Sequence, residues 1–95
     1  MAAYLYASIE VTDPTAYDEY RKGVPEVIAA YGGRYLARGG ATVRLEGDAP
    51  PSRVVILEFP DMARLRAFHE SPEYRSLLAI RQRAARSTLT AIEGV

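Results

Sequence analysis

Residues 53–59, RVVILEF, form the strongest β-strand signal in the chain. The four aliphatic residues at the centre of this stretch indicate a strand that is buried on both faces. The segment before it, residues 46–52 (EGDAPPS), predicts an exposed turn. After it, Pro60-Asp61 begins a helix whose apolar positions are Met62, Leu65 and Phe68. A buried strand is therefore predicted to lead directly into a helix.

The chain beyond this helix predicts a second helical segment and a last strand. Ser71-Pro72 restarts the helix, with Ser71 as the N-cap and Pro72 at the first helical position. One side of this segment presents Tyr74, Leu77, Leu78 and Arg81. Residues 87–93 (STLTAIE) are rich in Thr, Leu and Ile and predict a strand.

The N-terminal half predicts the same elements in the same order. Residues 4–11 (YLYASIEV) indicate a strand, and Asp13-Pro14 then caps and begins a helix. Pro25 cannot donate a hydrogen bond to the carbonyl of Arg21, so we expect a kink or a brief break there. Gly32-Gly33 should end the helix in a left-handed C-cap.

A short strand over residues 34–38 completes the set. Gly39-Gly40 would permit a bulge, after which residues 41–45 could continue the strand. The order is then β-α-β-β-α-β, the ferredoxin-like α+β arrangement, with a four-stranded antiparallel sheet and its helices on one face. At 95 residues the chain is predicted to be a single domain, residues 1–95.

Composition excludes several classes of function. Twelve Lys and Arg balance twelve Asp and Glu, whereas a nucleic-acid-binding protein needs a basic face. The absence of cysteine excludes disulfides, thiol catalysis and Cys-ligated zinc or iron–sulfur sites, and a single histidine excludes a His-rich metal site. We therefore expect no cofactor and no metal. The sequence shows neither a targeting segment nor a membrane span, which predicts a cytoplasmic protein that binds no membrane.

One face of the predicted sheet has no cover within the subunit. Two helices can cover only one face, so the other should carry polar residues in a monomer. Instead it would present Tyr4, Tyr6, Val54, Ile56, Thr90 and Ile92. This pattern predicts a homodimer in which two such faces pack together with C2 symmetry. The alternative is a monomer with an unusually apolar solvent face.

Several stretches, taken in order, resemble the DUF1330 family, a domain of unknown function in the dimeric α/β-barrel superfamily. They are TDP (12–14), YGGRYLARGG (31–40), EFP (58–60), SPEY (71–74), LAIRQRA (78–84) and EGV (93–95). The resemblance covers essentially the whole chain and implies a ferredoxin-like subunit whose sheets pair into a barrel. The superfamily also contains muconolactone isomerases, cofactor-independent monooxygenases, EthD-like proteins and haem-binding chlorite dismutases. The resemblance implies no catalytic residues, and the fold does not determine the function.

Candidate site residues follow from the expected cleft between sheet and helices. Strand parity places Tyr6, Ser8 and Glu10 on one face, which Glu58 joins if that face lines the barrel. An ion pair between Glu10 or Glu58 and Arg38 in an apolar cavity would shift the pKa of the carboxylate and allow it to act as a general base. The alternative is a salt bridge at the rim or a dimer contact.

The single histidine is a further candidate. His69 could shuttle protons near neutral pH, or it could be a surface or capping residue at a helix end. It is also the only imidazole that could serve as an axial haem ligand, but nothing near it resembles a haem pocket.

Tyrosine and arginine side chains could bind a ligand. Tyr6 or Tyr35 could line the barrel and donate a hydrogen bond to a ligand, whereas Tyr17, Tyr20, Tyr31 and Tyr74 fit helical core positions. Arg81 lies on the apolar side of its helix, so it should either extend outward or pair with Glu58 or another carboxylate.

Two hypotheses of function remain open. The first is a cofactor-independent enzyme that acts on a small apolar or aromatic molecule, with His69, Glu58 and Arg38 as catalytic candidates. Its ligand-binding candidates are Tyr6, Ser8, Glu10, Tyr35 and Arg81. The second is a non-catalytic homodimer that binds a small ligand or has a structural role.

Overall fold

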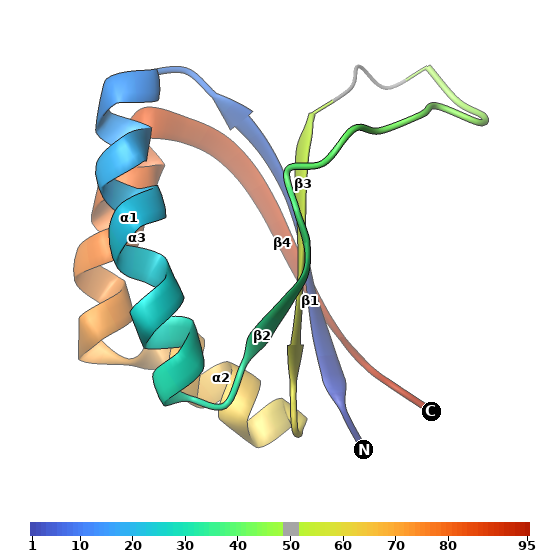
Figure 1. Ribbon diagram of the computed structural model, residues 1–95, viewed down its shortest axis with the longest axis vertical. Helices are drawn as coiled ribbons and strands as arrows, with labels where there is room; N and C mark the ends of the chain where they lie inside the picture. The colour runs from blue at the N-terminus through green and yellow to red at the C-terminus, as the bar shows by residue number, and fades with distance from the viewer. Residues whose placement is uncertain (49–51) are drawn as a thin grey trace.

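The computed structural model describes residues 1–48 and 52–95, and its order of elements confirms the ferredoxin-like prediction (Figure 1). The elements are β1 (Ala3–Val11), α1 (Pro14–Ala30), β2 (Arg34–Arg38), β3 (Arg53–Phe59), α2 (Met62–Glu70), α3 (Pro72–Ala84) and β4 (Ala85–Glu93). The predicted caps are present, because Asp13, Asp61 and Ser71 each accept a hydrogen bond from a backbone N–H of the helix that follows. The last strand begins two residues earlier than expected, directly after α3.

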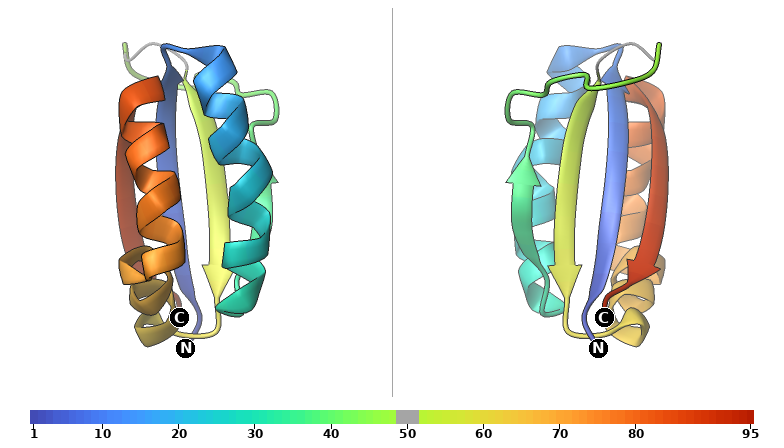
Figure 2. Two further views of the ribbon diagram at one scale, coloured as in Figure 1. Left: turned by 90° about the vertical axis from the view of Figure 1, so that its left-hand side faces the viewer. Right: turned by 90° about the vertical axis from the view of Figure 1, so that its right-hand side faces the viewer.

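The sheet is antiparallel, with strand order β2-β3-β1-β4. Strands β1 and β3 are therefore central, as the two-sided apolar pattern of residues 53–59 indicates. All three helices lie on one face of the sheet, and the other face is open (Figure 2). Within the described residues, no helix is long and apolar enough to cross a membrane.

The core lies between the sheet and the helices. Alternate residues of β1 point toward the helices, and their exposed fractions are 6% or less. Phe59 and Phe68 are almost completely buried, and their ring centroids lie 5.3 Å apart. The buried alternate residues of β1 are Ala3, Leu5, Ala7 and Ile9.

Helix α1 continues through Pro25, so the expectation of a break there is wrong. The carbonyl that Pro25 leaves without a helical donor is that of Arg21. The side chain of Arg38 supplies the replacement, because its Nη2 donates a hydrogen bond of 3.3 Å to the Arg21 carbonyl oxygen. A side chain of β2 thereby offsets part of the cost of a proline inside the helix.

Strand β2 ends at Arg38, and residues 41–45 do not continue it as expected. The irregularity in its pairing with β3 lies earlier, between Tyr35 and Ala37. Gly39 then takes a left-handed φ of 68°, a conformation that few residues other than glycine adopt. The chain there leaves the sheet and projects on its open side (Figure 1). The predicted turn over residues 46–52 lies partly outside the described residues.

Candidate functional site

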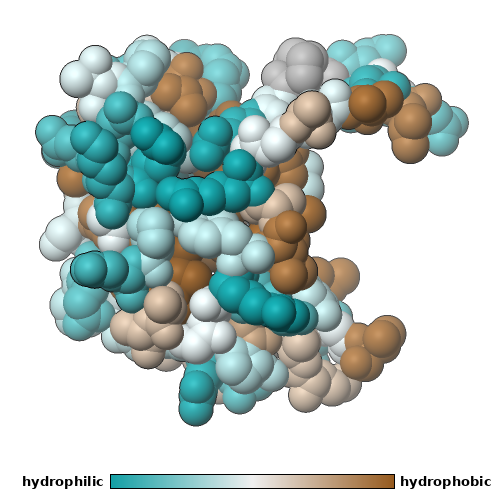
Figure 3. All heavy atoms as spheres, in the orientation of Figure 1, coloured by the Kyte–Doolittle hydropathy of each residue, from teal (hydrophilic) through white to brown (hydrophobic). Residues whose placement is uncertain are grey.

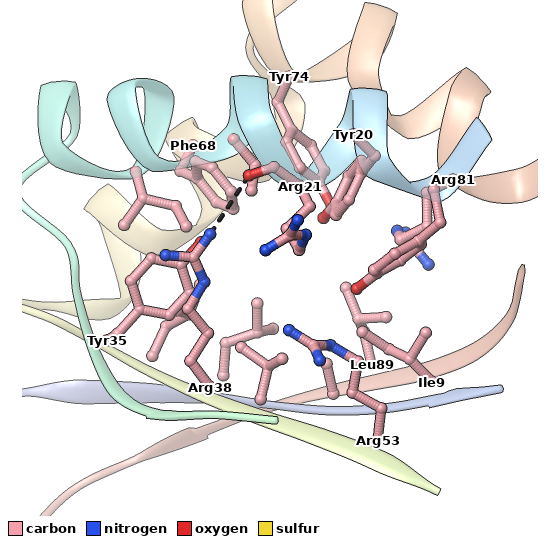
Figure 4. Close-up of a pocket in the computed structure, with 17 residues that line it drawn as sticks. Ile9, Tyr20, Arg21, Tyr35, Arg38, Arg53, Phe68, Tyr74, Arg81 and Leu89 are labelled. Atoms are coloured by element: carbon pink, nitrogen blue, oxygen red, sulfur yellow. Dashed lines mark hydrogen bonds between the residues drawn. The ribbon is translucent and has the colours of Figure 1, made fainter. Parts of the chain in front are cut away.

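A pocket opens between the helix-covered face of the sheet and helices α1 and α3 (Figure 4). Its volume is about 480 Å³ when the space at its open mouth is counted, and the centres of water-sized molecules can occupy about 40 Å³ of it. Most of the wall is apolar or aromatic. The wall residues are Leu5, Ala7, Ile9, Tyr17, Tyr20, Arg21, Val24, Ile28, Tyr35, Arg38, Arg53, Val55, Leu57, Phe68, Tyr74, Arg81 and Leu89.

Four arginines from four different elements line this pocket. Arg21 comes from α1, Arg38 from β2, Arg53 from β3 and Arg81 from α3, and Figure 4 shows their guanidinium groups around one space. Arg38 stacks on a tyrosine, with its Cζ 4.6 Å from the ring centroid of Tyr35. The lining therefore combines an apolar wall with several permanently positive groups.

Two tyrosine hydroxyls meet at the wall beneath α1 and α3. Tyr20 and Tyr74 share a buried hydrogen bond of 2.8 Å between their hydroxyl oxygens. Burial raises the pKa of Tyr20 far above its ordinary value, and the neighbouring Tyr74 adds to this effect. Tyr20 therefore stays protonated and can donate a hydrogen bond, but it cannot serve as a base near neutral pH.

The bulge in β2 separates the two arginines of that strand. Arg34 lies opposite Glu58 and forms an ion pair with it at 2.6 Å, whereas Arg38 lies opposite Val55 on the helix-covered face. The expected ion pair between Arg38 and Glu58 or Glu10 is therefore wrong. The Arg34–Glu58 pair is solvent-exposed on the arginine side, as the rim alternative anticipated.

Three of the predicted ligand-binding residues lie on the far side of the sheet from the pocket. Tyr6, Ser8 and Glu10 face away from the helices, and Ser8 is hydrogen-bonded to Ser52 at 2.6 Å. The expectation of one cleft shared by these residues and the helices is therefore wrong. Tyr35 and Arg81, in contrast, do line the pocket.

Among the described residues, Arg81 does not form the expected pair with a carboxylate. Its side chain is buried, with a residue exposed fraction of 6%, and its Cζ lies 5.7 Å from the ring centroid of Tyr20. Among residues 1–48 and 52–95, its Nε has no hydrogen-bond acceptor. Neither expectation, outward extension nor ion pairing, describes this residue.

His69 lies outside the pocket, in the last turn of α2. It packs against Tyr74, which lines the pocket, and the centroids of the two rings are 5.5 Å apart. It borders a separate open hollow with Leu65 and Ala91. Desolvation lowers the pKa of His69, and the positive charges of Arg75 and Arg81 lower it further. The imidazole is therefore neutral at physiological pH.

This lowered pKa predicts that acid destabilises the fold. As the pH falls through the ordinary histidine value of about 6.5, the unfolded chain takes up the proton before the folded chain does. Stability that is present above this pH should therefore decrease as the pH falls toward the pKa of folded His69. Urea unfolding at several pH values should show a smaller decrease for His69→Gln than for the wild type. Equal slopes for the two proteins would contradict the prediction.

The sequence reasoning missed Arg53, although a signal for it was present. Arg53 lies opposite Ile9 in the register and alternates with Val55, Leu57 and Phe59 toward the helices. An arginine at a core-facing position of a central strand is unusual and marks a polar group that points into an apolar layer. Tyr20 and Tyr74, predicted as core residues, are buried and also line the pocket.

Among the described residues, no group of three or more His, Asp or Glu side chains could hold a metal ion.

A family model described as a domain of unknown function, DUF1330, matches residues 2–95. No curated protein matches the sequence. Among solved structures, the chain is similar to the RPA0582 protein of unknown function from Rhodopseudomonas palustris. The TM-score is 0.81 at 22% identity, over 99% of this chain and 82% of that one.

Two further similar structures have descriptions that concern assembly or activity. A dimeric ferredoxin-like protein of unknown function from Thermobifida fusca matches with a TM-score of 0.67 at 17% identity, over 99% of this chain and 92% of that one. SnoaB, a cofactor-independent oxygenase from Streptomyces nogalater, matches with a TM-score of 0.69 at 9% identity, over 99% and 93%. At these identities the similarity shows the fold alone.

Proposed function

We propose that this chain, which belongs to the DUF1330 family, binds a small molecule with a largely apolar body in the pocket between its sheet and its helices. The pocket itself is the observation that supports this function. Its wall is mostly aliphatic and aromatic, with a few polar groups that converge on one space, as in small-molecule sites generally. The limited room inside it favours a small ligand.

Catalysis in the same pocket is the second candidate, and the buried tyrosine pair favours it. The hydroxyl of Tyr20 can donate a hydrogen bond beside positive charges that would stabilise an anion. The similar fold of a cofactor-independent oxygenase is compatible with this reading. Glu58 and His69 do not line the pocket, so Arg38 is the one predicted catalytic candidate that remains in it.

We further propose that the protein is a homodimer through the open face of the sheet. That face presents Tyr6 and Ile92 with exposed fractions of 45% and 62%, and the Arg34–Glu58 ion pair lies at its edge. The loop after β2 overhangs this side, with Val43 largely exposed. Apolar surface extends along this side of the sheet between the loop and the chain ends (Figure 3). Two similar structures are described as dimeric. A second copy would cover this surface.

Native mass spectrometry of protein purified without added ligand tests the binding function. We expect a dimer that carries a small-molecule adduct, which denaturation releases for identification. Val24→Phe should abolish the adduct, because Val24 lines the pocket and a larger ring would fill the space. Val95→Phe, the same change at an exposed position, should retain it.

Two outcomes would contradict the proposal. The first is an adduct that Val24→Phe retains. The second is a bare wild-type protein that also takes up none of a panel of small aromatic acids and amides.

A further inference from the structure

We propose that the ligand of this pocket carries a carboxylate group, which Arg53 and Arg81 bind, and this inference rests on the binding function proposed above. The identity of the anion-binding residues follows from their charge, burial and unused donors. The apolar remainder of the pocket would hold the body of the ligand.

The pocket holds an excess of positive charge. Of the residues that line it, four are arginines and none is Asp, Glu or His. Arg21 is partly compensated, because it pairs at 3.1 Å with the exposed Asp18. Arg53 and Arg81 form no ion pair within the part of the chain that the structure describes. A chain with zero formal net charge thus gathers uncompensated cations at one place.

Each of these two arginines has one buried donor without an acceptor among the described residues. In both Arg53 and Arg81 this donor is the Nε atom. The exposed fraction of Arg81 is only 6%. A guanidinium keeps its charge at any physiological pH, so burial without a partner costs free energy that an anionic ligand would recover.

The backbone leaves room for Arg53 to reach the pocket. A side chain at Gly39 would collide with the guanidinium group of Arg53, and Gly39 also takes its left-handed φ there. The Cζ of Arg53 lies 5.8 Å from the ring centroid of Tyr17, which holds the guanidinium over the pocket wall. The guanidinium group of Arg53 therefore lies against both a glycine and an aromatic ring.

A carboxylate fits this arrangement better than a phosphate does. Planar guanidinium groups bind the two oxygens of a carboxylate through parallel N–H donors. The space inside is small, and most of its remaining wall is aliphatic or aromatic, so it offers few donors to the additional oxygens of a phosphate. In Figure 4, Phe68 and Tyr35 lie on the side opposite Arg81. An aromatic or aliphatic body would extend from the arginines toward these rings.

Titrations with benzoate and its neutral isostere benzamide, followed by ¹H–¹⁵N NMR, test the inference. We expect the wild type to bind benzoate at least about tenfold more tightly than benzamide, because hydrogen bonds between charged partners are the stronger ones. Arg81→Met should lose most of this preference. Arg83→Met, the same change at an exposed position of the same helix, should keep it. Inorganic phosphate should not displace benzoate.

Each contrary result has a distinct meaning. Equal binding of benzoate and benzamide in the pocket would overturn the carboxylate inference and leave the binding function supported. If neither benzoate nor benzamide shifts the NMR signals of pocket residues, both the carboxylate inference and the binding function would be overturned. A preference that Arg81→Met retains would overturn the role of Arg81, and displacement by phosphate would overturn the assignment to a carboxylate. Arg81→Met should also be at least as resistant to urea as the wild type, which shows that the variant folds.

Discussion

Tyr6→Asp is expected to convert the proposed dimer into monomers. Tyr6 lies in the central strand β1, directly opposite Ile56 and Thr90, near the middle of the open face. In a C2 dimer the change buries one unpaired carboxylate in each subunit. At about 2 kcal/mol or more for each group, dimerisation should weaken by roughly a thousandfold. Light scattering coupled to size-exclusion chromatography should then report half the mass of the wild type.

Tyr6→Phe is the matched control, because it keeps the aromatic surface and removes only the hydroxyl. It should remain dimeric. The Tyr6→Asp monomer should keep its helical and strand content by circular dichroism, since the side chain of Tyr6 points away from the core. A Tyr6→Asp protein with unchanged mass would exclude the open face as the interface.

Local signals determined the order and most boundaries of the elements. The side chains of Asp13, Asp61 and Ser71 begin their helices because each has an oxygen that can accept from the first turn, which is a property of a few adjacent residues. Pro25 is the exception. Its missing hydrogen bond is compensated by Arg38, a residue of another element that the local sequence does not indicate.

The pocket could not be predicted in the same way, because it depends on the assembled fold. Its arginines come from four elements, and zero formal net charge conceals their convergence. The bulge between Tyr35 and Ala37 was decisive, since it turns Arg38 toward the helices and leaves Arg34 to pair with Glu58. A strict alternation through residues 34–38 would have placed both arginines on one face. One irregularity in the strand pairing is therefore the reason why the observed site differs from the predicted one.

Phe68→Ala is expected to lower the free energy of unfolding by about 3–5 kcal/mol, the range for removal of a buried phenylalanine ring. Phe68 is 1% exposed and touches three other rings. The centroid distances are 4.5 Å to Tyr74, 5.3 Å to Phe59 and 6.4 Å to Tyr31. A domain of this size has a total stability on the order of 5–15 kcal/mol, so the loss is a large share of it.

Urea unfolding at one fixed protein concentration measures this loss, because the effect of protein concentration on the dimer is then the same for all the proteins compared. Arg66→Ala, at an exposed position of the same helix, should change stability by no more than about 0.5 kcal/mol. Phe68→Leu keeps much of the buried volume and should cost clearly less than Phe68→Ala. If the alanine variant does not fold, the leucine variant still tests the prediction, and a leucine variant no less stable than Arg66→Ala would contradict it. Phe68 also lines the pocket. The same ring therefore belongs to the core and to the part of the pocket wall against which the body of the ligand would lie.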